Sequence, residues 1–416
     1  MKVAVVGAGV SGLVAAFELH ERHDLTVFEA GAYAGGHTNT VTVETPGGPL
    51  AVDTGFIVFN DRNYPRFEAL LDRLRVASQP SPMSFGVSDG RGFEYASTNP
   101  NGLFAARANL VRPAFYRMLA DVPRFQRAGR ELLAGGDDPS LRGWLDGLGL
   151  SAAFVERVIV PQAAAVWSAP VEQMASFPAR FLVQFFDNHG MLGLRGRPTW
   201  RTVTGGSAAY VRALTAPFAD RIRLHTPVER IERLPVGVAV TPRGGEPEVF
   251  DEVVVAAHAD QALAMLAEPT RAEREVLGAF PYQPNEAVLH TDRSLLPRRR
   301  RAWASWNYHL LGEPAPGAPT VTYHMNRLQS LDAAEDYCVT LNRTEAIDPS
   351  RIVRRIAYTH PIYTREGQAA QPRHLEVSGA DRLHYCGAYW GWGFHEDGVA
   401  SAQRAVAALE REPVPA

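Results

Sequence analysis

The chain of 416 residues has little of several things that would point directly to a chemistry. Lys2 is its only lysine, and Cys338 and Cys386 are its only cysteines, far apart and outside any CxxC pair. Two isolated thiols argue against a disulfide framework or a dithiol redox centre and favour a reducing compartment. No apolar run approaches the roughly 20 residues that a membrane span requires. We therefore expect a cytoplasmic protein without a transmembrane segment.

Two further absences narrow the function. The net charge of −3 offers no bulk attraction to nucleic acid, so no nucleic-acid partner is expected. The thirteen histidines show no ligand spacing such as HExxH, so no metal is expected either. With 46% hydrophobic residues the chain can bury a full core, and its length predicts two domains.

The first thirty residues carry a dinucleotide-binding pattern. Residues 2–6 predict a short buried parallel strand, and Gly7-Ala8-Gly9-Val10-Ser11-Gly12 follows before a helical pattern. In such a GxGxxG the first glycine makes the turn, the second admits a diphosphate, and the third lets helix and strand pack closely. A second strand, residues 25–28, ends at Glu29, where a carboxylate would reach ribose hydroxyls. A signal peptide is the alternative for this segment, but its cleavage would remove the motif.

Two more glycine-containing turns favour FAD over NAD as the cofactor. Gly35-Gly36-His37-Thr38 comes six positions after Glu29, and Asp53-Thr54-Gly55-Phe56 follows. With them the sequence resembles the FAD-dependent amine oxidase and phytoene desaturase superfamily, although His37 stands where arginine is commoner. The resemblance implies FAD contacts from a set of N-terminal residues: Gly7, Gly9, Val10, Ser11, Gly12, Glu29, Ala30, Gly35, Gly36, His37, Thr38, Gly55 and Phe56.

The resemblance also implies the fold. It predicts the α/β class, with a Rossmann-like FAD-binding domain of the glutathione reductase type on a parallel sheet and an interleaved α+β substrate domain like that of amine oxidases. Val228 sits where these flavoproteins pair a valine backbone with the adenine, and residues 251–257 look like their next buried strand. We expect the FAD-binding domain to comprise residues 1–80, 201–265 and 378–416, and the substrate domain residues 81–200 and 266–377.

The stretch YCGAYWGWGFHEDG, residues 385–398, is rich in glycine and aromatic residues. It predicts a short strand at 384–387 and a helix over 397–409. In the family this segment returns to the flavin, where a helix N-terminus stabilises the negative charge formed on reduction. The expected FAD contacts here are Gly387, Phe394, Glu396, Asp397, Gly398 and Val399. The alternative is a purely structural role, in which the aromatic residues fill the core and the helix that follows is capped at its N-terminus.

The whole pattern is most similar to a bacterial subgroup of predicted NAD/FAD-binding proteins. The shared stretches are residues 166–192, 197–211, 303–309 and 385–398. The subgroup suggests a link to unsaturated or methyl-branched fatty acyl chains. No second GxGxxG is present, so we expect electrons to come from the organic substrate, as a hydride passed from a C–H bond to flavin N5.

The missing lysine bears on the substrate. Many amine oxidases of the superfamily use a lysine near flavin N5, whereas Lys2 begins the first strand. Residues 358–371 offer no cysteine for a covalent flavin, so noncovalent FAD is expected. We therefore expect desaturation or double-bond isomerisation of a lipophilic acyl substrate. An amine or amino-acid oxidase is the alternative, and a non-catalytic lipid carrier, like the Rab GDP-dissociation inhibitors, is a further one.

Candidate acid/base residues are few. His395 and His189 can pass protons near neutral pH, and Tyr389 could orient the substrate. For both histidines a hydrogen-bonded structural role is the alternative. The residues expected to line the substrate cavity are Asn60, Asn188, Trp200, Trp306, Tyr308, Trp390 and Trp392.

Four arginines stand together at residues 298–301. A solvated loop is the simple interpretation. The sharper one is a docking patch for anionic lipid headgroups or an acidic acyl carrier, which would place the protein at the inner face of a membrane as a peripheral component.

Overall fold

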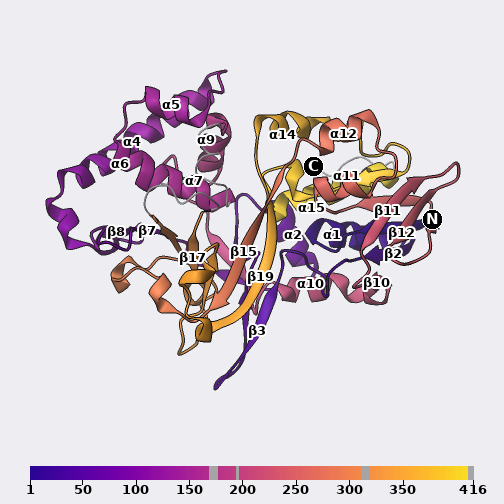
Figure 1. Cartoon of the computed structure of the whole chain (residues 1–416), viewed down its shortest axis with the longest axis horizontal. Helices are drawn as coiled ribbons and strands as arrows, with labels where there is room; N and C mark the ends of the chain where they lie inside the picture. The colour runs from indigo at the N-terminus through magenta and orange to yellow at the C-terminus, as the bar shows by residue number, and fades with distance from the viewer. Residues whose placement is uncertain (168–176, 194–195, 312–318, 411–416) are drawn as a thin grey trace.

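The computed structural model describes residues 1–167, 177–193, 196–311 and 319–410 (Figure 1). Its first layer is a five-stranded parallel sheet drawn from three distant stretches of chain. The strands, in spatial order, are β10 (Ile222–Arg223), β2 (Asp24–Phe28), β1 (Lys2–Val6), β14 (Glu252–Val255) and β20 (Leu383–Tyr385). β1 has apolar residues on both faces because both are covered, as is typical of parallel sheets.

The two faces of this sheet pack against different partners. Val3 and Val5 face one hydrophobic cluster, and Ala4 and Val6 face another. The helices of the first cluster are α1 (Val10–Leu19), α2 (Pro65–Arg73), α10 (Ala208–Thr215) and α15 (His395–Glu410). The elements of the second are the antiparallel strands β11 (Val228–Arg233), β12 (Val238–Pro242) and β13 (Glu248–Phe250) with α11 (Ala259–Met265) and α12 (Arg271–Leu277).

A second, seven-stranded sheet stands beside the first. Its neighbours pair antiparallel except β16 and β7, which run parallel. The strands, in spatial order, are β19 (Ile352–Pro361), β15 (Tyr282–His290), β18 (Cys338–Leu341), β17 (Val321–His324), β16 (Trp306–His309), β7 (Phe85–Ser88) and β8 (Glu94–Ala96). The long strands β15 and β19 run between the two halves of the molecule in Figure 1.

Helices gather at the end of the molecule remote from the parallel sheet, at the left of Figure 1. They are α4 (Pro113–Ala134), α5 (Leu141–Gly147), α6 (Ala152–Phe154), α7 (Val160–Trp167) and α9 (Ala179–Asn188), with a π-helical turn at Val155–Ile159 between α6 and α7. Their buried side chains form one hydrophobic cluster with the seven-stranded sheet.

Short elements complete the described chain. They are the hairpin β3 (Thr40–Thr45) and β4 (Gly48–Asp53), the small sheet of β5 (Phe59–Asn60), β9 (Trp200–Val203) and β6 (Ser78–Pro80), and the helices α3 (Pro100–Leu103), α13 (Met325–Leu328) and α14 (Arg365–Ala370). Among the described residues, no helix is both long and apolar enough to cross a bilayer.

The α/β class and the strands predicted at residues 2–6, 25–28 and 251–257 are confirmed within one or two residues. The closing helix begins at His395, two residues before the predicted start. Asp397 lies inside its first turn, where a carboxylate oxygen accepts a hydrogen bond from the backbone N–H of Phe394 at 2.9 Å. Asp397 is therefore the third residue of the helix and not its first, and it caps the N–H of the residue before the helix, as the acidic residue of a capping box does.

Candidate functional site

The glycine loop between β1 and α1 is built as the motif predicts. Gly7 has φ +102°, and its N–H donates to the carbonyl of Phe28 at 2.8 Å. A Cβ on Gly12 would lie 1.9 Å from the Gly7 carbonyl oxygen, so only glycine lets α1 pack on the loop. A Cβ on Gly9 would meet no protein atom within 4 Å, and Gly9 lines a large cavity. The bare face of Gly9 thus opens where the helix N-terminus favours an anion.

Glu29 ties the end of β2 to this loop. One carboxylate oxygen accepts from the N–H of Ala8 at 2.8 Å, and the other accepts from the N–H of Gly31 at 2.7 Å. A carboxylate has about four acceptor sites, so capacity remains for ribose hydroxyls. Glu29 and Ala30 both line the cavity.

The second and third glycine turns close on the first. The N–H of Gly35 donates to the Ala8 carbonyl at 2.7 Å, and a Cβ on Gly36 would lie 3.1 Å from the Gly9 Cα. A Cβ on Gly55 would lie 2.1 Å from the His37 carbonyl oxygen. Three backbone segments therefore meet at van der Waals distance around one end of the cavity.

The C-terminal motif reaches the same place. A Cβ on Gly398 would lie 2.7 Å from Val10 Cγ1, so α15 packs directly on the start of α1. The N–H of Gly387 donates to Ser401 Oγ at 2.9 Å, which fixes the turn after β20. Residues from both distant parts of the chain line one cavity of about 1450 Å³. Pockets for small ligands usually have about 300–1000 Å³, so this one has room for a cofactor and a substrate.

His395 is the first residue of α15 and lies on the cavity wall. Its ring stacks on Phe56 with 3.5 Å between centroids, and its Nε2 hydrogen bonds with Thr38 Oγ1 at 2.9 Å and with the Tyr210 hydroxyl at 3.0 Å. Burial, with His37 nearby, holds the pKa of His395 well below its ordinary value, so the imidazole is neutral. His395 is thus positioned by three partners beside the start of α15.

His189 also lines the cavity, at the end of α9. Its Nδ1 hydrogen bonds with the Phe185 carbonyl at 2.8 Å, so Nδ1 carries the proton and Nε2 is left as an acceptor. Burial lowers the pKa of His189. Trp200 stacks beside the ring with 5.7 Å between centroids.

The aromatic residues of the closing motif separate into two groups. Tyr389, Trp392 and Phe394 line the cavity, and Trp392 stacks on Phe181 with 4.0 Å between centroids. Trp390 does not line it: its ring packs edge-on against His374, 4.6 Å between centroids, inside the core that covers the other face of the parallel sheet. Tyr389 and Trp390 pack on each other in this core, 5.0 Å between centroids, and Tyr389 also reaches the cavity edge, so only part of the aromatic run lines the cavity.

Several expected FAD residues act behind the cavity wall. The Glu396 carboxylate accepts hydrogen bonds from the N–H groups of Arg66 and Phe67, at 3.1 and 3.0 Å, and so caps α2. Val399, on α15, is fully buried in the hydrophobic cluster that α15 shares with α1. Asp397 is buried too, which raises its pKa to about 6. The expected FAD residues outside the cavity lining are Gly12, Thr38, Glu396, Asp397, Gly398 and Val399; those on it are Gly7, Gly9, Val10, Ser11, Glu29, Ala30, Gly35, Gly36, His37, Gly55, Phe56, Val228, Gly387 and Phe394.

The expected substrate residues divide in the same way. Trp200, Trp306 and Trp392 line the cavity. Asn60 is buried and accepts from the N–H of Asn63 at 2.9 Å, which shapes a turn, while Asn188 accepts from Gln184 Nε2 at 3.0 Å on the surface of α9. Tyr308 lies in a separate, smaller cleft of about 420 Å³.

Sequence reasoning missed the apolar lobe of the cavity. Its walls come mainly from α4, α6, the π-helical turn, α7 and α9: Met118, Leu119, Val122, Phe125, Phe154, Val158, Ile159, Ala165, Val166, Phe185 and Phe186. An apolar helix face that lines a cavity has the same periodicity as one that lines a core, so no pattern separates them. The buried hydroxyl of Tyr363, which has no partner among the described residues, was missed as well.

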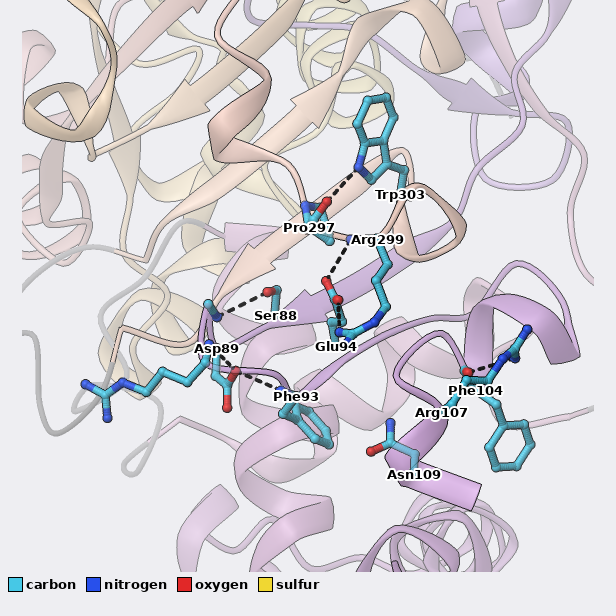
Figure 2. A network of polar contacts seen from close by, with 12 residues as sticks. Ser88, Asp89, Phe93, Glu94, Phe104, Arg107, Asn109, Pro297, Arg299 and Trp303 are labelled. Atoms are coloured by element: carbon cyan, nitrogen blue, oxygen red, sulfur yellow. Dashed lines mark hydrogen bonds and ion pairs between the residues drawn. The ribbon is translucent and has the colours of Figure 1, made fainter. Parts of the chain in front are cut away.

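The arginine run is not one uniform patch. Figure 2 shows Arg299 paired with Glu94, whose side chain is buried, and the Trp303 indole donating to the Pro297 carbonyl, at 2.7 Å. Arg299 therefore balances a buried charge. Arg298, Arg300 and Arg301 remain exposed.

Fold and site together define a dinucleotide-binding flavoprotein architecture in which a glycine-walled cleft continues into an apolar lobe. Residues 10–323 match the family described as flavin containing amine oxidoreductase, so the chain belongs to that family. A putative flavin-containing monoamine oxidase AofH from Mycobacterium tuberculosis is 27% identical over 257 residues, which cover 59% of this chain and 54% of the relative. The chain thus spans about half the length of this curated relative.

Solved structures share the fold over nearly the whole chain. Cyclohexylamine oxidase from Brevibacterium oxydans IH-35A superposes with a TM-score of 0.70 at 17% identity, covering 99% of both chains. A CLA-producing fatty acid isomerase from P. acnes superposes with a TM-score of 0.67 at 15% identity, covering 98% of both chains. At such identities the likeness shows the fold alone.

The cofactor of this family is FAD, and the residues present fit it. The open face of Gly9 admits a diphosphate, and Glu29 has free acceptor capacity for a ribose. At the far end, Gly387 and the start of α15 offer bare backbone and a positive helix end beside the aromatic walls.

Proposed function

We propose that the chain is an FAD-dependent oxidoreductase that removes hydride from a C–H bond of an apolar substrate, and that this substrate is a fatty acyl chain undergoing desaturation or double-bond isomerisation. One observation supports the substrate class above all. The lobe formed by the helices is lined almost throughout by aliphatic and aromatic side chains, with Gln126 and Gln162 as the polar groups contributed by α4 and α7.

Bound FAD supplies the redox chemistry by accepting hydride at N5. The protein residues bind, orient and exclude water. Gly9 and Gly36 would hold the diphosphate and Glu29 the ribose, while the N-terminus of α15 would provide backbone N–H groups at the ring end. His189 Nε2 is the acceptor available for a substrate proton, and we retain His395 and Tyr389 as further candidates. FAD is proposed to bind noncovalently, because both cysteines are buried and neither lines the cavity.

An amine oxidase is the second candidate. The family description and the names of the AofH relative and cyclohexylamine oxidase favour it. Against it stands Lys2, the only lysine, which begins β1 at the end of the strand opposite the glycine loop, does not line the cavity, and places its ammonium over the Phe250 ring, 4.6 Å from its centroid. A carrier without chemistry would not need the retained diphosphate and ring-end elements, and is the weakest of the three.

Anaerobic substrate exposure of the flavin-loaded protein separates these functions. A panel of fatty acids and acyl esters should bleach the flavin or move a double bond, measured by absorbance at 450 nm and by mass spectrometry of the products. Bleaching by amines alone would reverse the ranking. No reaction with either class would favour the carrier.

A further inference from the structure

Three histidine side chains meet at the glycine-walled end of the cavity. His37 follows the Gly35-Gly36 turn, His258 lies between β14 and α11, and His360 lies on β19. The ring centroid of His37 is 6.0 Å from that of His258 and 5.3 Å from that of His360. All three line the cavity, and no group of His, Cys, Asp and Glu side chains in the described part of the chain has metal-binding geometry.

This histidine cluster (His37, His258 and His360) lies beside the expected position of the diphosphate. Gly36, the residue before His37, packs on Gly9, whose open face admits the anion. The Nε2 of His37 is buried in the cavity wall and has no hydrogen-bond partner among the described residues. A buried polar atom without a partner normally signals a missing ligand or solvent molecule.

The cluster is uncharged without its ligand. The pKa is lowered to about 4 for His37 and His258 and to about 3 for His360, mainly because the rings are buried. For His37 the neighbouring His258 is the second cause. The Thr359 carbonyl acts weakly in the opposite direction on His37.

The groups around the cluster do not supply a compensating negative charge to His37. Tyr358 stacks on His37 with 4.8 Å between centroids, and Tyr282 stacks on His258 with 4.5 Å; burial raises the pKa of both phenols, so both are neutral. His395 is neutral as well. The charged side chains on the same cavity wall are Glu29, engaged with backbone N–H groups, and Glu229 and Arg243.

Hydrogen bonding distinguishes the three rings. The Asn285 amide lies 3.0 Å from His360 Nδ1, and because Asn285 Oδ1 accepts from Asn342, its Nδ2 donates to the ring. His360 is therefore held in a neutral tautomer. His37 has no such donor at Nε2, so it can take a second proton when a negative group arrives.

We propose that the histidine cluster is a proton-linked clamp for the cofactor diphosphate, in which binding of the diphosphate places a proton on His37. Where an arginine would carry a permanent charge, His37 acquires one only in the complex. The proposal rests on FAD binding and is independent of the substrate proposed above.

The sign of the pH dependence follows from linkage. The complex holds more protons than the free protein, so affinity is highest at low pH and falls as pH rises through the raised pKa of His37 in the complex. One proton limits the slope to tenfold per pH unit. We expect the dissociation constant of FAD to be about tenfold higher at pH 8 than at pH 6, and the binding of FAD or ADP at pH 7 to be accompanied by the uptake of about 0.5 proton, by linkage.

The test measures FAD release from the loaded protein by free-flavin fluorescence between pH 6 and 8. Calorimetry of the flavin-free protein in buffers of different ionisation enthalpy counts the protons. ADP carries the diphosphate without the flavin, and riboflavin carries the flavin without the diphosphate, so only ADP should reproduce the uptake.

Variants assign the effect to His37. His37→Arg should bind FAD with no proton uptake and a flat pH profile, and His37→Asn should weaken binding more at pH 6 than at pH 8. His374→Asn is the matched control, because burial lowers the pKa of His374 to about 4, as for His37, but His374 lies outside the cavity. Binding of FAD without proton uptake, equal uptake with riboflavin, or unchanged uptake in either His37 variant would overturn the proposal and leave the proposed reaction untouched.

Discussion

The two ends of the cavity are built by opposite means. At the glycine-walled end, where we propose that the diphosphate binds, the walls are backbone: Gly9, Gly36 and Gly55 meet their neighbours at distances that no side chain permits or leave a face bare for a ligand. At the lobe the walls are side chains carried mainly on α4, α6, the π-helical turn, α7 and α9. The first end accepts one ligand and tolerates little change, whereas the second can alter its shape one side chain at a time.

Two glycine-to-alanine substitutions in the same loop, Gly12→Ala and Gly9→Ala, test this contrast most sharply. Gly12→Ala places Cβ 1.9 Å from the Gly7 carbonyl, so α1 must move off β1. We expect a loss of about 3 kcal/mol of unfolding free energy, as for strong overpacking, measured by chemical denaturation of the flavin-free protein. Gly9→Ala should fold within about 1 kcal/mol of wild type, because its Cβ meets no protein atom.

Gly9→Ala should nevertheless bind FAD at least about a hundredfold more weakly, because the methyl occupies the ligand's approach. Gly147→Ala is the control: its Cβ also meets nothing within 4 Å, and it lies away from the cavity. A Gly9→Ala protein purified with full flavin would contradict the assignment of this face to the diphosphate.

The lobe should respond differently. Val122 lies on α4 and lines the lobe, so Val122→Phe fills space meant for the substrate. We expect unchanged flavin content and a rate of flavin reduction by acyl substrates lower by about tenfold or more, the scale of a one-to-two-methylene misfit. Stopped-flow absorbance measures it.

Val111→Phe, at an 81% exposed position, controls for adding a phenyl group. If Val122→Phe lost flavin in proportion to activity, the two ends of the cavity would not be separate units.

The smallest effect is expected outside the cavity. Arg298, Arg300 and Arg301 are exposed, and replacing them with serine should weaken binding to vesicles of anionic lipid by about fivefold at physiological salt, with flavin content unchanged. Sedimentation with the vesicles measures it. Arg299 is left in place because its removal would strand the buried carboxylate of Glu94.

The control for charge alone is a triple replacement of Arg127, Arg142 and Arg271 by serine, since these side chains are 79%, 74% and 93% exposed. Equal weakening by both triples would mean that net charge, and no local patch, governs the binding.

Sequence reasoning succeeded where backbone constraints dictate the residue. The turn at Gly7, the close packing at Gly12 and the position of Glu29 after β2 could be predicted because turn geometry and a fixed spacing leave few alternatives, while their contacts with FAD stay a prediction. It failed where the direction of a side chain decides. Trp390 and Trp392 are two positions apart in one motif, yet Trp390 packs in the core at the end of a 3₁₀ turn and Trp392, beyond the turn, lines the cavity.

The histidine cluster shows a second kind of failure. His37, His258 and His360 are separated by more than a hundred residues at each step, and only the pairing of β15 with β19 and the turn after β14 bring them together. Long-range assembly of this kind leaves no local pattern in one sequence.

The packing of Gly398 on Val10 sets the order of events during synthesis. When the ribosome has made the glycine loop, β2 and Glu29, the nascent chain still lacks the residues that would form the wall beside the flavin ring. That wall is added almost four hundred residues later, so the proposed FAD site is complete only after α15 has been translated.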